Sequence, residues 1–214
     1  YEIVSRDWSS DVCSSDLGSG SGRSSPRNQF VADILHERGI GTLLFDLLSP
    51  DEAENRSYVF AIDFLADRLL NAKRWMEQQP ECSGLKIGYF GASTGAAAAL
   101  LAASREPDRI FSVVSRGGRP DLAAPYLPSV AAPTLLIVGE KDEAVVDYNF
   151  SAMKSLKCTK RIELVPGASH LFEETGALER VANIAAEWFL EYSGEKSRKA
   201  IEKYEEKKIR KIAG

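Results

Sequence analysis

Apolar and polar positions follow two alternating periodicities along the chain, and together they predict strands that alternate with helices. Short apolar runs fit buried strands at residues 42–45, 86–90, 110–115, 134–138 and 161–165. Between the runs, apolar residues at helical spacing fit helices at residues 27–38, 57–79, 96–104, 148–156 and 178–192. Strands that alternate with helices form a mostly parallel sheet covered on both faces, so the pattern predicts an α/β fold.

The pattern also divides the chain into three parts. Residues 1–17 fit neither a signal peptide nor a strand, because Ser and Asp dominate where a core strand needs Val or Ile. Residues 7–17, DWSSDVCSSDL, resemble one reading frame of a translated sequencing adapter. We predict a non-native or disordered segment at 1–17, a domain at 18–192 and a charged helical tail at 193–214. Coding sequence in sister reads that matches the adapter-like codons would contradict the first of these predictions.

A Gly-x-Ser-x-Gly motif, Gly91-Ala92-Ser93-Thr94-Gly95, lies between a predicted strand and a predicted alanine-rich helix. In that position a sharp turn lifts the serine hydroxyl above the sheet, and the helix N-terminus behind it favours developing negative charge. The glycines allow the turn without a Cβ clash. The context predicts that Ser93 is a nucleophile; a Gly/Ser turn that merely opens a helix is the alternative.

A serine nucleophile needs a base, and the chain has two histidines, His36 and His170. We expect His36 on the surface of an early helix. His170 follows the last predicted strand, at the sheet edge where active-site residues of such folds gather, so it is the predicted base. The alternative is a loop histidine that stabilises a turn.

An imidazole base needs a carboxylate to orient it. Asp142 follows the strongest predicted strand and stands between Ser93 and His170 in the chain, which is the Ser, Asp, His order of this fold. Asp121, and less so Glu140 and Glu143, are the competing carboxylates, and a simple turn residue is the alternative for Asp142.

The composition of the chain limits the class of protein to which it can belong. A chain of 214 residues can bury a sizeable core as one domain, and its net charge of −4 argues against a nucleic-acid partner. No apolar run reaches the roughly 18 residues needed to span a bilayer. Cys13, Cys82 and Cys158 are too scattered for a metal cluster or a disulfide framework, which predicts a reducing compartment, the cytoplasm. The oligomeric state stays open.

The motifs resemble those of the α/β-hydrolase superfamily, and more narrowly its dienelactone hydrolase-like branch. The resemblance covers about residues 18–192, and it rests on the segments GSGSGRSSPRN (18–28), LLFDLL (43–48), GASTG (91–95), SRGGRPDL (115–122) and PGASHLFEE (166–174). It implies hydrolysis of a small ester, lactone or related acyl compound through an acyl-enzyme intermediate, without a cofactor or metal. It also implies an oxyanion hole formed by the backbone N–H groups of Ser19 and Thr94.

Two features depart from that family. Its namesake enzymes use a cysteine nucleophile, so Ser93 points away from dienelactone as the substrate. The family's early strands, and often a histidine, precede the position of Gly18, where this chain has Leu17; we therefore expect the N-terminal strands to be missing and the Ser19 loop to be poorly held. Relatives of this branch also occur beside phosphoribosyltransferase domains.

The sequence also allows alternatives for two arginines and for the function. Arg116 and Arg119 lie near the expected mouth of the site, either attracting an acidic substrate or standing as surface arginines. A non-catalytic binding module on the same fold is an alternative function, since fold does not imply function. An acyltransferase or perhydrolase that uses the same three residues is another.

Overall fold

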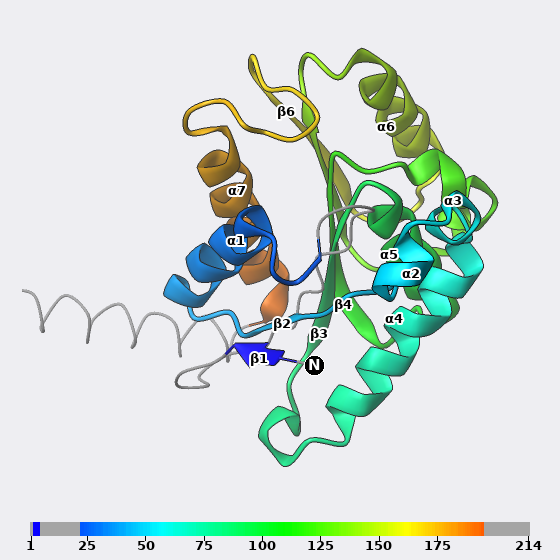
Figure 1. The fold of residues 1–214 in the computed structure, drawn as a ribbon, viewed down its shortest axis with the longest axis vertical. Coiled ribbons are helices and arrows are strands. Elements are labelled where there is room, and N and C mark those ends of the chain that lie inside the picture. Colours follow the sequence, from blue (N-terminus) through cyan, green and yellow to red (C-terminus); the bar gives the residue numbers. More distant parts are fainter. Residues whose placement is uncertain (1, 5–21, 195–214) are drawn as a thin grey trace, which may run out of the picture.

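A four-stranded parallel sheet forms the centre of the protein (Figure 1). The computed structural model describes residues 2–4 and 22–194. The strands lie in the order β3 (Ile87–Ala92), β4 (Ile110–Arg116), β5 (Thr134–Gly139) and β6 (Lys160–Val165), and each neighbouring pair is parallel. All four were predicted, within one or two residues at either end. Because the strands are parallel, their carboxyl ends meet at one edge of the sheet.

A separate antiparallel pair joins β1 (Glu2–Val4) to β2 (Thr42–Leu44). The expectation that residues 1–17 hold no strand is therefore wrong for Glu2–Val4. The count of Ser and Asp over the whole segment hid two consecutive residues of high β-propensity, Ile3 and Val4. The adapter-like run at 7–17, the predicted oxyanion donor Ser19 and residues 195–214 of the predicted tail lie outside the described residues.

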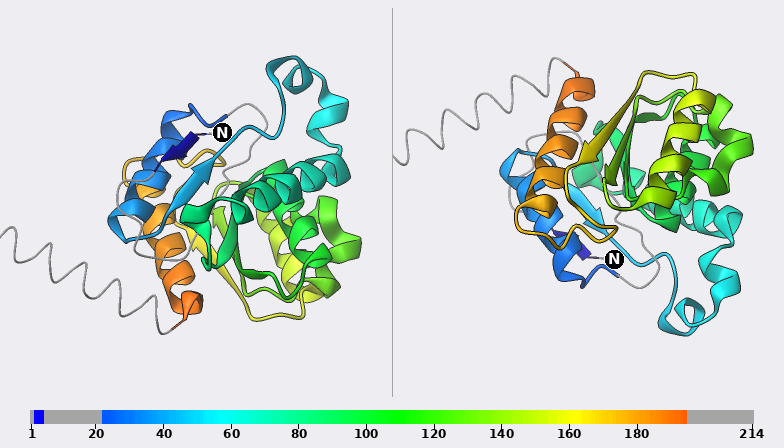
Figure 2. Two further views of the ribbon diagram at one scale, coloured as in Figure 1. Left: turned by 90° about the horizontal axis from the view of Figure 1, so that it is seen from below. Right: turned by 90° about the horizontal axis from the view of Figure 1, so that it is seen from above.

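Helices cover both faces of the sheet, as the alternating pattern predicts (Figures 1 and 2). Helices α1 (Pro26–Glu37) and α7 (Ala177–Ser193) lie side by side on one face. Helices α4 (Ile62–Glu77), α5 (Thr94–Arg105) and α6 (Glu143–Ser155) lie on the other. Each face has its own apolar core, and the alanines of α5 let that helix pack closely against the sheet.

The elements between the strands differ from the predictions in four places. The helix expected at 57–79 is broken into α3 (Arg56–Val59) and α4, with Phe60 and Ala61 between them. The break carries no Pro or Gly, and Phe60 continues the apolar spacing, so the sequence pattern does not reveal it. Residues 120–129, for which no helix was predicted, form a 3₁₀ helix, η2 (Pro120–Ser129). Two shorter elements, α2 (Pro50–Ala53) and η1 (Pro80–Cys82), were also not predicted.

Candidate active site

Ser93 stands at the turn between β3 and α5, at the carboxyl edge of the sheet. Its backbone has φ 51° and ψ −122°, a conformation that L-residues with side chains rarely adopt. The turn is tight: a Cβ on Gly91 would come within 2.6 Å of the Ala96 Cα, so only glycine fits there. Thr94 is the first residue of α5, so its N–H has no acceptor within the helix. This is the geometry of a nucleophile elbow.

His170 and Asp142 meet across two neighbouring loops at the same edge. The His170 Nδ1 and the Asp142 Oδ2 are 2.6 Å apart, a hydrogen-bonding distance. The Asp142 side chain is 18% exposed and the His170 side chain 39%, so the carboxylate lies behind the imidazole and the ring faces solvent. A carboxylate on Nδ1 fixes the tautomer in which Nε2 can accept a proton.

Residues 116–119, at the end of β4, connect the Ser93 turn with the His170 ring. The Ser93 N–H donates to the Arg116 carbonyl at 3.3 Å, and the Arg119 N–H donates to the Ser93 carbonyl at 3.0 Å. Gly117, at φ +51°, lies against His170: a Cβ there would be 3.5 Å from the ring atoms Cε1 and Nδ1. Within the described residues the Ser93 hydroxyl makes no hydrogen bond, and catalytic hydrogen bonds are often long without substrate.

The loops that carry Asp142 and His170 are fastened to each other by hydrogen bonds. The Glu140 N–H donates to the Val165 carbonyl at 3.1 Å, and the Lys141 N–H donates to the Ala168 carbonyl at 3.0 Å. The Gly167 N–H donates to the Glu140 carboxylate at 2.8 Å. These bonds explain why the Asp142 carboxylate and the His170 imidazole stay close together although they follow different strands.

Phe172 and Glu174 anchor the His170 loop from its other side. Phe172 is 2% exposed in the core under α1 and α7, yet its φ is 55°, and besides Ser93 it is the only non-glycine residue with positive φ in the described part of the chain. The Glu174 carboxylate accepts from the Ser169 N–H at 2.9 Å. Hydrogen bonds from its own backbone N–H and from Ser169 lower the pKa of Glu174. Neither residue was among the predicted site residues, although both lie in the segment PGASHLFEE (166–174).

The competing candidates have other partners. His36 is half-buried and hydrogen-bonded to the Thr42 hydroxyl at 2.6 Å, and burial lowers its pKa, so the expectation of a surface histidine is wrong. Asp121 binds the Arg119 guanidinium through both oxygens, at 2.8 and 2.7 Å. Glu140 accepts from Gly167, and Glu143 is the first residue of α6. Among these residues, only Asp142 is placed on His170.

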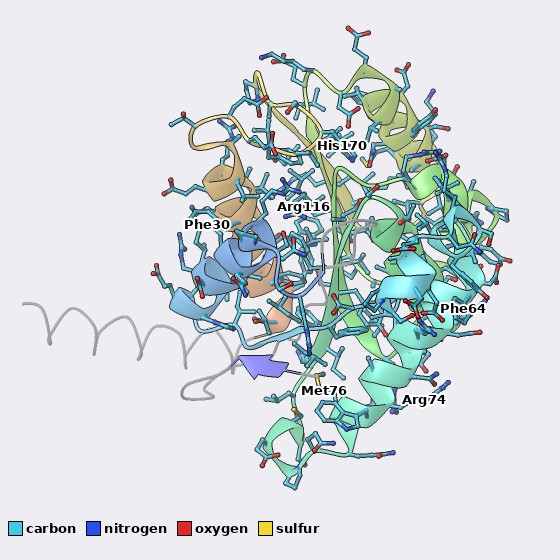
Figure 3. The ribbon with its side chains drawn as sticks, in the orientation of Figure 1. Phe30, Phe64, Arg74, Met76, Arg116 and His170 are labelled. Atoms are coloured by element: carbon cyan, nitrogen blue, oxygen red, sulfur yellow. The ribbon has the colours of Figure 1, made fainter. Side chains whose placement is uncertain are left out.

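Arg116 and Arg119 are not the exposed surface arginines that were one of the two alternatives from the sequence. Arg116 is 7% exposed, and its Nη2 donates to the Asn28 Oδ1 at 3.2 Å. Figure 3 shows its side chain between α1 and the sheet, below His170. Arg119 is held by Asp121, which raises the pKa of the guanidinium, and stacks on the Tyr148 ring. A single-sequence pattern cannot separate a buried arginine from an exposed one.

The described residues offer little other chemistry. Cys82 and Cys158 are free thiols, and burial raises the pKa of both, so neither is a ready thiolate. Within residues 2–4 and 22–194, no group of three or more His, Cys, Asp or Glu side chains is arranged to hold a metal ion. In the same residues, no helix has the length and apolar character required to cross a membrane.

The chain is similar to known proteins in sequence and in fold. The dienelactone hydrolase family matches residues 47–202. A crystal structure of dienelactone hydrolase from Anabaena variabilis ATCC 29413 is 50% identical, with a TM-score of 0.83, over 86% of this chain and 88% of that chain. The chain belongs to the dienelactone hydrolase family. The predicted α/β-hydrolase fold and the predicted enzyme family are thereby confirmed.

Two further proteins are similar to this chain. Est1E from Butyrivibrio proteoclasticus has a TM-score of 0.74 at 17% identity, over 89% of this chain and 91% of that chain, a likeness of fold. A protein of Mycobacterium tuberculosis (strain ATCC 25618 / H37Rv), named "Putative phosphoribosyl transferase", is 52% identical over 175 residues, or 82% of this chain and 40% of that protein. The chain thus spans about two fifths of the length of this mycobacterial relative.

Proposed function

We propose that this member of the dienelactone hydrolase family is a serine hydrolase that cleaves a small ester, lactone or related acyl compound. The observation that carries the proposal is the 2.6 Å contact between His170 Nδ1 and Asp142 Oδ2, on a ring that borders the same loop as Ser93. In this proposal Ser93 is the nucleophile, His170 the base and Asp142 the acid that orients the base.

The first half-reaction forms an acyl-enzyme. His170 Nε2 takes the proton of the Ser93 hydroxyl while the oxygen attacks the substrate carbonyl carbon. The resulting oxyanion accepts a hydrogen bond from the Thr94 N–H at the start of α5, and from the Ser19 N–H as the family resemblance implies; one such donor contributes about 3–4 kcal/mol. Collapse of the intermediate breaks the bond to the leaving group, which receives the proton from His170.

The second half-reaction restores the enzyme. His170 takes a proton from water, and the hydroxide that forms attacks the acyl carbon. The second tetrahedral intermediate expels the Ser93 oxygen, which regains its proton from His170. The net reaction adds one water across the acyl bond. A serine nucleophile favours simple esters or lactones over dienelactone, whose hydrolysis by the namesake enzymes uses a cysteine.

The test is hydrolysis of p-nitrophenyl esters by the wild type and four variants. Ser93→Ala and His170→Ala are expected to lower kcat on the order of 10⁴- to 10⁶-fold, and Asp142→Asn about 10⁴-fold. Asp121→Asn is the matched control: this carboxylate binds Arg119 and should be dispensable for the chemistry. Full activity of Ser93→Ala, or equal losses in both aspartate variants, would contradict the assignment.

A fluorophosphonate probe separates this proposal from its alternatives. A serine hydrolase or an acyltransferase is labelled at Ser93, whereas a binding module is not. Competition between water and an added alcohol or peroxide acceptor then distinguishes hydrolysis from acyl transfer or perhydrolysis. We assign the transferase name of the mycobacterial relative to the part of that protein outside this match, because this chain, which it matches over 175 residues, belongs to a hydrolase family.

The cytoplasmic location stays a prediction. The free thiols of Cys82 and Cys158 support it, since reducing compartments keep thiols unpaired. Cell fractionation with antibody detection measures it directly.

A further inference from the structure

Helix α6 makes a second connection to the candidate site, separate from the Asp142 contact. Asp142 is the residue that precedes the first turn of α6, and Asn149 lies seven residues later, two turns along the same side of the helix. Asn149 is fully buried, at 0% exposure. Its Nδ2 donates to the Gly118 carbonyl at 3.0 Å and to the Val145 carbonyl at 2.7 Å.

The orientation of this amide follows from its partners. Both neighbours of Nδ2 are carbonyl oxygens, which accept and do not donate, so exchanging the Asn149 oxygen and nitrogen would remove both bonds. The Asn149 Oδ1 is buried without a hydrogen-bond partner in the described part of the chain. A buried amide that leaves one atom unpaired is costly, so its presence at this position calls for a role beyond filling space.

The Gly118 carbonyl belongs to the loop that touches both Ser93 and His170. One residue earlier, Gly117 lies against the imidazole, and its N–H donates to the Ile137 carbonyl at 2.7 Å. One residue later, the Arg119 N–H donates to the Ser93 carbonyl at 3.0 Å. A shift of the Gly118 peptide therefore moves the supports of the nucleophile and the base together.

We propose that Asn149 is a positioning residue, which locks helix α6, directly after Asp142, to the loop that supports Ser93 and His170. The inference rests on the proposed function, in which these three residues react. Asn149 touches none of them; it acts through the Gly118 peptide, and so sets the acid at a fixed distance from the other two. A misplacement of reacting groups by about 1 Å costs on the order of 10²-fold in rate.

The test compares Asn149→Leu and Asn149→Ala with the wild type. The leucine variant removes the donor but keeps most of the volume, so it separates positioning from a loss of packing. Both variants are expected to lower kcat for a p-nitrophenyl ester roughly 10- to 100-fold with KM unchanged, well below their melting temperatures. Loss of packing alone would lower Tm and leave kcat of the folded enzyme unchanged.

A control and a second measurement complete the design. Asn183→Ala removes the same kind of bond, from the Asn183 Nδ2 to the Glu179 carbonyl at 3.0 Å, in α7 on the other face of the sheet, together with the bond from Arg38 to the Asn183 Oδ1 at 2.9 Å. Backbone amide exchange, followed by NMR, should accelerate at Gly117 and Arg119 in the Asn149 variants and not in the control. This measurement needs no activity, so it still decides the positioning role if the wild type hydrolyses no ester and the proposed function fails. Wild-type exchange at both amides together with wild-type kcat in Asn149→Leu would overturn the inference.

Discussion

At the scale of single residues, the candidate site concentrates backbone strain. Ser93 and Phe172, the two non-glycine residues with positive φ in the described chain, stand at the nucleophile turn and two residues after the base. A residue held in the left-handed region costs of order 1–3 kcal/mol and persists only where its surroundings require it. At Phe172 the requirement is the ring itself, which is 2% exposed in the apolar core and so ties the His170 loop down.

This strain predicts an unusual order of stability at position 172. Phe172→Ala should lower the free energy of unfolding by about 3–5 kcal/mol, because it empties a buried site. Phe172→Gly loses the same ring but fits the φ of 55°, so it should be more stable than the alanine variant by about 1 kcal/mol. Urea denaturation of the three proteins measures the difference. An alanine variant more stable than the glycine variant would show that the left-handed backbone is not maintained.

At the scale of elements, the α2 turn is fastened to α4 through one carboxylate. The Ser49 N–H donates to Glu52 Oε2 at 2.8 Å, and the Glu52 N–H to the Ser49 hydroxyl at 3.3 Å, which is a capping box. The Arg68 guanidinium donates to both Glu52 oxygens, at 2.6 and 2.8 Å, and to the Leu47 carbonyl at 2.6 Å. The Arg68 bond and then the Ser49 bond lower the pKa of Glu52 from 4.5 to about 2.

The lowered pKa predicts the pH range in which this contact stabilises the fold. The folded state binds the Glu52 proton more weakly than the unfolded chain, so the contribution is complete above pH 4.5 and is lost as pH falls toward 2. Glu52→Gln should therefore be less stable than the wild type at neutral pH, and the gap should close in acid. Urea midpoints at a series of pH values measure it, with Glu54→Gln as the control. A gap that does not depend on pH would contradict the prediction.

The helices and strands differ in how well the sequence alone predicts them. Thr134–Gly139 and Ala177–Ser193 were predictable because their apolar periodicity is strong and nothing competes with it. The break between α3 and α4 was not, because no local residue marks it and the packing of Val59 and Ile62 on the core decides it. The local sequence pattern indicates which face of an element is apolar, whereas tertiary packing decides where the chain turns.

The same limit applies to the candidate site. Order along the chain and position after a strand were enough to single out Ser93, Asp142 and His170, and the contact between the last two is present. Asp121 could not be set aside from sequence, because its pairing with Arg119 is a matter of side-chain direction. Asn149 carried a faint signal, a polar residue on the side of a helix that also holds Val145 and Ala152, both buried.

At the scale of the whole molecule, we propose that residues 18–192 form the domain and that residues 1–17 are not required for it. The described contact of that segment is the pairing of β1 with β2, over three residue pairs. A chain that begins at Gly18 should therefore keep a single cooperative unfolding transition, with a denaturant slope only slightly reduced, because the slope follows the surface exposed on unfolding. Urea denaturation followed by circular dichroism tests this. Loss of the cooperative transition would show that the segment belongs to the domain.

The fastening of the β5–α6 loop to the β6–α7 loop has a consequence for how the proposed chemistry begins. The imidazole and its carboxylate lie on loops that are hydrogen-bonded to each other, so in the proposed mechanism the base is oriented before any ligand arrives. Preorganised groups of this kind cost no reorganisation when the reaction starts. In the proposed mechanism, an incoming substrate has to bring only the Ser93 hydroxyl into contact with His170. Substitutions in the neighbouring loops can therefore change which substrate binds without disturbing the contact between His170 and Asp142.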